Sequence, residues 1–305
     1  MRHAMIVKKD HGVTLIELMI VMVIAAFLVA GIYSLFITQH RSYTVQDQVA
    51  GIQQDARVAL DIMARDIRMA GFLTEAGSSS GFGGISVNTH NFAVEPVNGG
   101  TNNPDEITVV FAAEQATTVM NVVDKQVTLD TGGVSHFIGT GKPYVAFEGE
   151  NNVYQISGIA GDTLTLTNAP PASLDDPGFG THALLVKAIT YNVQNNALTR
   201  DEHTGAGAQP LAGDGVNTVV EDLQIAYQVA GSNDWIFDAD TAVWPAGKTN
   251  ADIRMVRINI IVRTVVPDPQ ETSFFKPGCE DRPQENTFTG CRRRVYTTVV
   301  KARNL

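Results

Sequence analysis

One carboxylate, Glu17, stands at the edge of an apolar run. No charged side chain occurs from Leu18 to Ile37. A charged side chain at the centre of a membrane-spanning helix costs about 2.5–3.5 kcal/mol, and such residues usually face a partner. Two roles for Glu17 stay open. It either completes an S/T-x-x-E capping box with Thr14, or it pairs with a positive charge.

Cys279 and Cys291, the chain's two cysteines, lie close together near its C-terminal end. Their spacing does not match the paired C-x-x-C sets that bind zinc. A single disulfide, which closes the loop 279–291, is the simplest interpretation, and a redox or metal role is the alternative. Because a disulfide requires an oxidising compartment, the protein would need a route out of the cytoplasm.

The motifs that could indicate an enzyme lack the context that catalysis needs. Gly77, Ser79 and Gly81 match the G-x-S-x-G elbow of hydrolases. That elbow needs a strand before it and a helix after it, whereas low-complexity sequence surrounds this one. The seven histidines include no H-E-x-x-H pair. We therefore expect no catalytic residue, metal site, cofactor or small-molecule substrate.

Two features could contact other macromolecules. Trp235 and Trp244 lie in a loop-like segment rich in Asp and Gly. Tryptophans often anchor protein interfaces, and packing on their own domain is the common alternative. Arg292–Arg294 form a local basic patch, which salt pairing within the chain would also explain. The formal net charge of −10 argues against nucleic acid as a general partner.

The elements that must position Glu17 are a short leader and a long apolar segment. Residues 1–12 carry three basic residues and one acid. Residues 18–37 would form a helix of about 30 Å, the thickness of a bilayer's hydrocarbon core. Positive charge before the span should keep the leader in the cytoplasm and place the rest of the chain outside. A secretory signal is cleaved after its apolar run, but here the small residue, Gly12, precedes it.

Residues 12–17, together with the basic leader and the apolar run, resemble the prepilin signature of type IV pilins and type II secretion pseudopilins. The resemblance implies that a membrane-embedded prepilin peptidase cuts between Gly12 and Val13 and methylates the new N-terminal amine. Most members carry Phe where this chain has Val13. The resemblance also implies that Glu17, fifth in the mature chain, pairs with the free α-amine of a neighbouring subunit in the filament.

A helical period continues beyond the apolar run. No proline occurs before Pro96, and apolar residues recur every three or four positions from Val45 to Ala70, which predicts an amphipathic helix. We expect one helix over residues 13–72, with a membrane half at about 18–37. The amphipathic half would pack on the protein's own globular part, and Gly71 is a candidate C-cap.

Residues 73–305 predict a β-rich globular head. The stretch 76–84 has the glycine- and serine-rich composition of a flexible joint. Beyond it, short apolar runs alternate with turn residues and show no βαβ rhythm, which indicates antiparallel strands. The runs cover 107–112, 119–129, 144–147, 153–159, 163–166, 184–192, 197–200, 219–228, 253–266 and 295–300. We therefore expect an α+β, pilin-like fold in which a long N-terminal helix packs on a mostly antiparallel β head.

Further stretches resemble the PilW family of type IV pilus minor pilins, relatives of the J-type minor pseudopilins of type II secretion. They span residues 41–46, 64–72, 197–200, 216–227, 253–264 and 292–304. The resemblance implies a non-enzymatic minor pilin that helps to initiate or cap type IV pilus assembly through N-terminal helix bundling. A J-like tip component of a secretion pseudopilus is the alternative. A tethered surface adhesin or enzyme with an uncleaved anchor is a third possibility.

The resemblance also implies partners and a location. The partners are prepilin peptidase, other minor pilins and the major pilin. The location is the bacterial inner membrane, crossed once with the head in the periplasm, and then the pilus on the cell surface.

Overall fold

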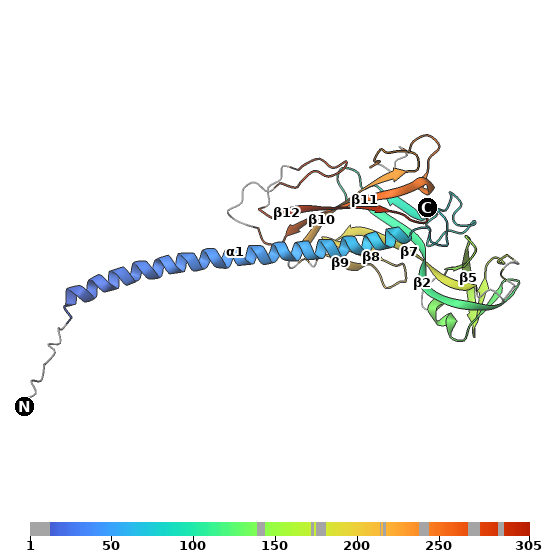
Figure 1. The fold of residues 1–305 in the computed structure, drawn as a ribbon, viewed down its shortest axis with the longest axis horizontal. Helices are drawn as coiled ribbons and strands as arrows, with labels where there is room; N and C mark the ends of the chain where they lie inside the picture. The colour runs from blue at the N-terminus through green and yellow to red at the C-terminus, as the bar shows by residue number, and fades with distance from the viewer. Residues whose placement is uncertain are drawn as a thin grey trace, which may run out of the picture. The chain divides into compact units, whose positions relative to one another are not determined.

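The computed structural model describes residues 13–138, 144–171, 174, 181–213, 215, 218–237, 244–267, 275–285 and 290–305, without the side chains of 114–116. Gly12 and the rest of the leader lie outside these residues. The chain divides into two compact units, residues 1–50 and residues 51–305. Each contains part of one helix, α1 (Leu15–Met69), which is blue in Figure 1.

One long N-terminal helix is present, as expected, and it spans Leu15–Met69 within the expected range 13–72. Its last residue is Met69, and Gly71 follows with a φ of +78°. The amide of Gly71 donates to the carbonyl of Val110 over 3.0 Å. A Cβ on Gly71 would lie 2.4 Å from Cδ2 of Leu305. The turn therefore needs glycine both for its left-handed backbone and for space.

The C-terminal part of α1 forms one wall of the main hydrophobic core. Small and medium apolar side chains on one face are fully or almost fully buried there. They are Ile52, Ala56, Ala59, Leu60, Met63, Ala64, Ile67 and, just beyond the helix, Ala70. The predicted amphipathic stripe is thus confirmed from Ile52 onward, and its burial against the globular unit supplies the stabilisation that an isolated helix lacks.

A three-stranded antiparallel sheet provides much of the opposite wall of this core. Its order is β10 (Thr218–Val229), β11 (Ile253–Thr264), β12 (Arg293–Lys301). Val256, Ile258, Ile260 and Val262 of β11 are fully buried and join the helix residues in one cluster. The alternation in the sequence predicted this strand correctly.

The second sheet has nine strands, and all of its pairings are antiparallel. Its order is β1-β2-β3-β6-β5-β4-β7-β8-β9. The bounds are β1 Val94–Val97, β2 Glu106–Val123, β3 Gln126–Leu129, β4 Tyr144–Phe147, β5 Val153–Ala160, β6 Thr163–Leu166, β7 His182–Gln194, β8 Ala197–Asp201 and β9 Gln209–Ala212.

Part of the nine-stranded sheet closes on itself. Since β2 pairs with both β3 and β7, the strands β2-β3-β6-β5-β4-β7 form a closed ring of pairings. A separate core fills this small barrel, with Phe137 of the short helix η1 (Gly133–Phe137), Phe147, Leu164 and Leu166 almost fully buried. Closure removes exposed strand edges. The sequence predicted the strands but not the ring.

Two details of the sequence prediction are corrected. The run 119–129 is not one strand, because the chain turns at Asp124, whose φ is +53°, between β2 and β3. The stretch 76–84 is not a flexible joint. Gly77 pairs with Phe92 in a β-bridge, and the side chain of Phe82 is 1% exposed in a core cluster. An aromatic side chain among the glycines anchors the segment.

Candidate functional site

Thr14 and Glu17 form a capping box at the start of α1, which is one of the two roles left open for Glu17. The amide and the hydroxyl of Thr14 each donate to Oε2 of Glu17 over 3.0 Å, and the amide of Glu17 donates to Oγ1 of Thr14 over 3.3 Å. Val13, immediately before them, is 75% exposed. The cap fixes the carboxylate beside the first turn, next to the residue that the predicted cleavage would make N-terminal.

The first part of α1 exposes a continuous apolar surface within its own unit. Every large hydrophobic side chain from Leu15 to Ile37 is at least 50% exposed, and none of the described residues up to Ala50 is buried. This is the one helix among the described residues that is long and apolar enough to cross a membrane. A helix that is apolar all round requires apolar surroundings, so it suits membrane anchoring or helix bundling.

The predicted disulfide is wrong, because Cys279 and Cys291 are not bonded to each other. Glu280, next to Cys279, accepts from Nδ2 of Asn259 over 2.6 Å. The Sγ of Cys291 lies 4.0 Å from the carbonyl oxygen of Val265. These two anchor points are six residues apart on and just after β11, about 20 Å along an extended strand. Disulfide geometry needs Cα atoms within about 7 Å of each other.

Ion pairs, not a covalent link, fix the segment 275–285 on the three-stranded sheet. Glu280 accepts a bidentate pair from Arg257 over 2.7 and 2.6 Å. Arg282 and Lys276 lie 2.5 and 3.3 Å from the fully buried carboxylate of Asp222. Burial beside Glu280 and Asp222 raises the pKa of Cys279 to about 12, so its thiol stays protonated and slow to react at neutral pH.

Both tryptophans predicted as partner contacts pack on the globular unit. The guanidinium carbon of Arg257 lies 4.4 Å from the ring centroid of Trp235. Trp244 is partly buried against the main core. Each ring keeps some exposed surface, so contact with another subunit stays a prediction.

One buried carboxylate had no signal in the sequence. Asp105 is 4% exposed and accepts from the amides of Gly99 and Ile225 over 3.0 and 2.7 Å. Burial raises the pKa of Asp105 to about 7, with smaller contributions in the same direction from Asp281 and Asp222. An isolated Asp before a strand looks like any loop residue, and only the fold brings β10 over it.

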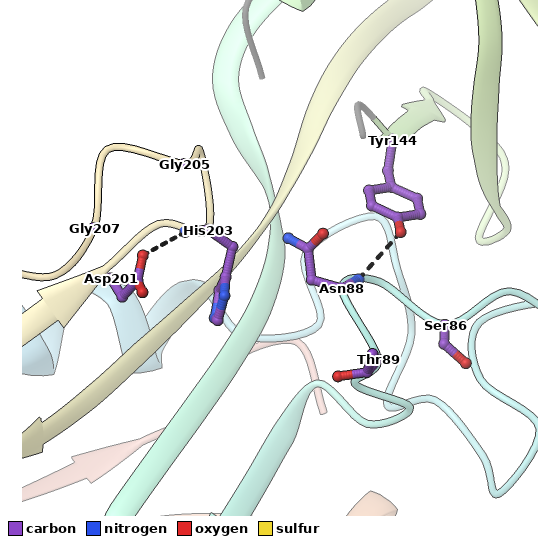
Figure 2. Close-up of a pocket in the computed structure, with 8 residues that line it drawn as sticks. All are labelled: Ser86, Asn88, Thr89, Tyr144, Asp201, His203, Gly205 and Gly207. Carbon is purple, nitrogen blue, oxygen red and sulfur yellow. Dashed lines mark hydrogen bonds between the residues drawn. The ribbon is translucent and has the colours of Figure 1, made fainter. Parts of the chain in front are cut away.

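A cavity of about 810 Å³ opens between the turn before β1 and the loop after β8. Figure 2 shows the residues that line it. They are Ser86, Asn88, Thr89, Tyr144, Asp201, His203, Gly205 and Gly207. The sequence prediction missed this cavity, because its walls come from segments that are far apart along the chain.

The comparisons with known proteins point to the N-terminal segment. A family model described as the prokaryotic N-terminal methylation motif matches residues 7–33, which include Gly12, Val13 and Glu17. Among solved structures, the chain is similar to a type IV-like pilin from Thermus thermophilus, with 14% identity, a TM-score of 0.37, and coverage of 83% of this chain and 97% of that chain. No curated protein matches it.

Proposed function

We propose that this pilin-like protein is a minor pilin that helps to initiate or cap a type IV pilus. In this proposal, prepilin peptidase cuts between Gly12 and Val13 and methylates the new amine. The apolar part of α1 holds the chain in the inner membrane, with the head in the periplasm, and then bundles with the helices of other minor pilins and the major pilin. The protein acts as a structural subunit.

The observation that carries the proposal is the position of Glu17. It lies at the edge of a helix surface that the chain leaves uncovered, inside the matched methylation motif. A carboxylate taken into such an apolar bundle needs a positive partner, because an unpaired buried charge is strongly destabilising. The free α-amine of a neighbouring subunit is a cation that the same processing step creates.

Three variants separate docking from capping. Glu17→Gln keeps an oxygen that can accept from Thr14 but removes the charge. Thr14→Ala removes the hydroxyl of the cap but keeps the charge, and Glu17→Ala removes both. We expect Thr14→Ala to enter sheared filaments and both Glu17 variants to be excluded, with all three inserted in the membrane. Immunoblots of filament and membrane fractions give the readout.

The opposite pattern would support capping alone. If Glu17→Gln assembled normally while Thr14→Ala and Glu17→Ala failed together, the charge would be unnecessary. Intact mass adds an independent check, because the filament form should begin at Val13 and carry one methyl group. A filament form that kept residues 1–12 would contradict the processing step.

A J-like minor pseudopilin of type II secretion is the second candidate, since the same motif and helix would serve it. The two differ in where the chain is found and what its deletion does. Recovery in extracellular filaments, with loss of piliation on deletion, supports the minor pilin. Loss of protein secretion with normal piliation supports the pseudopilin instead.

A further inference from the structure

We propose that the head binds a neutral saccharide in the cavity shown in Figure 2. All of its lining residues belong to the globular unit, residues 51–305, and none of them is a helix residue on which the proposed function depends. Binding there would give the subunit a recognition role in addition to its structural one. The proposal does not depend on whether the chain enters a pilus or a pseudopilus.

One wall of the cavity is a tightly fixed turn. Val87 and His90 exchange two backbone hydrogen bonds of 2.9 Å across Asn88 and Thr89. The amide of Asn88 donates to the hydroxyl of Tyr144 over 3.2 Å, which ties the turn to β4. Val87 is fully buried beneath it. The side chains of Asn88 and Thr89 are thus presented on a rigid support.

The opposite wall is held by a chain of hydrogen bonds around His203. Its amide donates to Oδ1 of Asp201 over 2.8 Å, and its Nε2 lies 2.8 Å from the hydroxyl of Thr190. That hydroxyl in turn lies 2.7 Å from the buried hydroxyl of Thr108. The ring of His203 is therefore fixed, and Oδ2 of Asp201 has no hydrogen-bond partner among the described residues.

Three non-glycine residues of the cavity walls have a left-handed backbone. Asn88, Thr89 and His203 have φ values of +48°, +77° and +56°. Asn tolerates this region, whereas a β-branched residue such as Thr rarely occupies it. At Asn88 and Thr89 the positive φ values are those of the two-residue turn between Val87 and His90. This turn directs both side chains to one wall of the cavity, and His203 lines the other.

The chemistry of the lining selects the ligand class. Among the described lining residues none carries a permanent positive charge, which disfavours phosphate, sulfate and carboxylate ligands. None carries an aliphatic side chain, which disfavours lipid. No group of three His, Cys, Asp or Glu side chains suited to a metal occurs in the described part of the chain. Hydroxyl, amide, carboxylate and imidazole groups remain, and they match ligands whose hydroxyls both donate and accept.

The size of the cavity agrees with this class. Pockets that bind small molecules commonly enclose about 300–1,000 Å³. A Cβ on Gly205 or Gly207 would meet no atom within 4 Å, so these glycines leave the rim open to solvent. One or two sugar rings could enter from that side.

Purified full-length protein in detergent micelles should be tested on an array of neutral, sialylated and sulfated oligosaccharides. Titration calorimetry with the best neutral glycan follows. Asn88→Gly removes a lining amide without straining the turn, and Asp201→Asn keeps an acceptor for His203 but removes the charge. Asn195→Gly, the same change at a positive-φ turn position outside the cavity, is the control.

We expect saturable binding of at least one neutral glycan. Since one hydrogen bond contributes about 0.5–1.5 kcal/mol, Asn88→Gly and Asp201→Asn should each weaken binding about three- to tenfold, while Asn195→Gly leaves it unchanged. Circular dichroism melts check that each variant is folded. Binding restricted to sialylated or sulfated glycans, no binding at all, or equal losses in the control would each overturn the proposal.

Discussion

The two parts of α1 belong to one helix but meet opposite surroundings. From Leu15 to Ala50 no side chain is buried within the chain, although the segment contains the uncharged apolar run from Leu18 to Ile37. From Ile52 to Ile67 the apolar side chains form a narrower stripe, and that stripe is covered by the sheets of the globular unit. The more hydrophobic part is therefore the part that the protein leaves bare.

The two apolar surfaces of this one helix therefore need different partners to cover them. The stripe with a polar opposite face is stabilised by the chain's own head. The all-round apolar part has no polar face to turn toward water, so lipid or other helices must cover it. A variant in the first part should affect insertion and assembly, and a variant in the second should affect folding.

A matched pair of methionines gives the largest expected contrast. Met63 is 0% exposed and Met22 is 65% exposed. Met63→Ala should lower the free energy of unfolding of the head by about 2–5 kcal/mol, through lost burial and a residual cavity. Met22→Ala should leave it unchanged. Urea unfolding in detergent micelles, followed by tryptophan fluorescence, measures both, and equal effects would break the comparison.

The next effect concerns a polar contact between α1 and the sheet. The hydroxyl of Tyr191, which is fully buried, donates to Oδ2 of Asp66 over 2.5 Å, and Arg200 Nε donates to the same oxygen over 3.0 Å. Asp66→Ala leaves these buried donors without their acceptor and should cost about 1–3 kcal/mol of unfolding free energy. Asp61→Ala, exposed on the same helix, should stay within about 0.5 kcal/mol.

The head should respond to pH through Asp105. Its pKa is about 7 in the folded protein against an ordinary value of 3.8, so between these values the folded chain binds a proton that the unfolded chain has lost. This contribution to stability is complete below about pH 4 and is lost as the pH rises through 7, by at most about 1.4 kcal/mol per pH unit.

The matched variant for this pH effect is Asp105→Asn. In this variant the free energy of unfolding should fall less steeply with rising pH than in the unchanged protein. Urea unfolding at pH 5, 6 and 7 measures this dependence in both proteins. Subtracting the two profiles cancels the carboxylates whose pKa values are lowered, such as Glu95 and Glu202, because they are present in both proteins. Identical slopes in the two proteins would show that Asp105 does not titrate in this range.

The smallest expected effect is that of a reductant. Because ion pairs hold the segment 275–285 and the two cysteines are not bonded, dithiothreitol should leave the melting temperature unchanged. Two thiols should react with an alkylating reagent after unfolding without reduction. A mass two hydrogens lower, with no alkylation until reductant is added, would contradict this arrangement.

Structural features that depend on patterns within a few residues were predicted from the sequence. The period of three to four residues predicted α1, and alternation predicted β11 with its buried Val256, Ile258 and Ile260. The predicted runs 184–192 and 197–200 correspond to β7 and β8, and the chain turns between them at Asn195 and Asn196, whose φ values are +52° and +65°. The S/T-x-x-E spacing predicted the capping bonds between Thr14 and Glu17.

The cysteines and the cavity could not be predicted from local sequence patterns. Cys279 and Cys291 are close in sequence, which suggested a bond. In the structure, Glu280, next to Cys279, is bound by Asn259 and Arg257 of β11. Cys291 instead lies near Val265, just after the end of β11. The cavity beside His203 joins a turn and a loop more than a hundred residues apart. Neither arrangement leaves a local signature.

By itself, the sequence determined the long helix, its apolar segment and the positions of most strands. Each of these follows from composition or periodicity, which act within a few turns or one strand. The cleavage and methylation motif was recognised through its resemblance to the prepilin signature. Tertiary structure alone decided that β2 pairs with both β3 and β7 to close a barrel, that Asp105 is buried under β10, and that ion pairs replace the disulfide. These depend on contacts between distant segments, whose geometry is fixed only when the sheets pack.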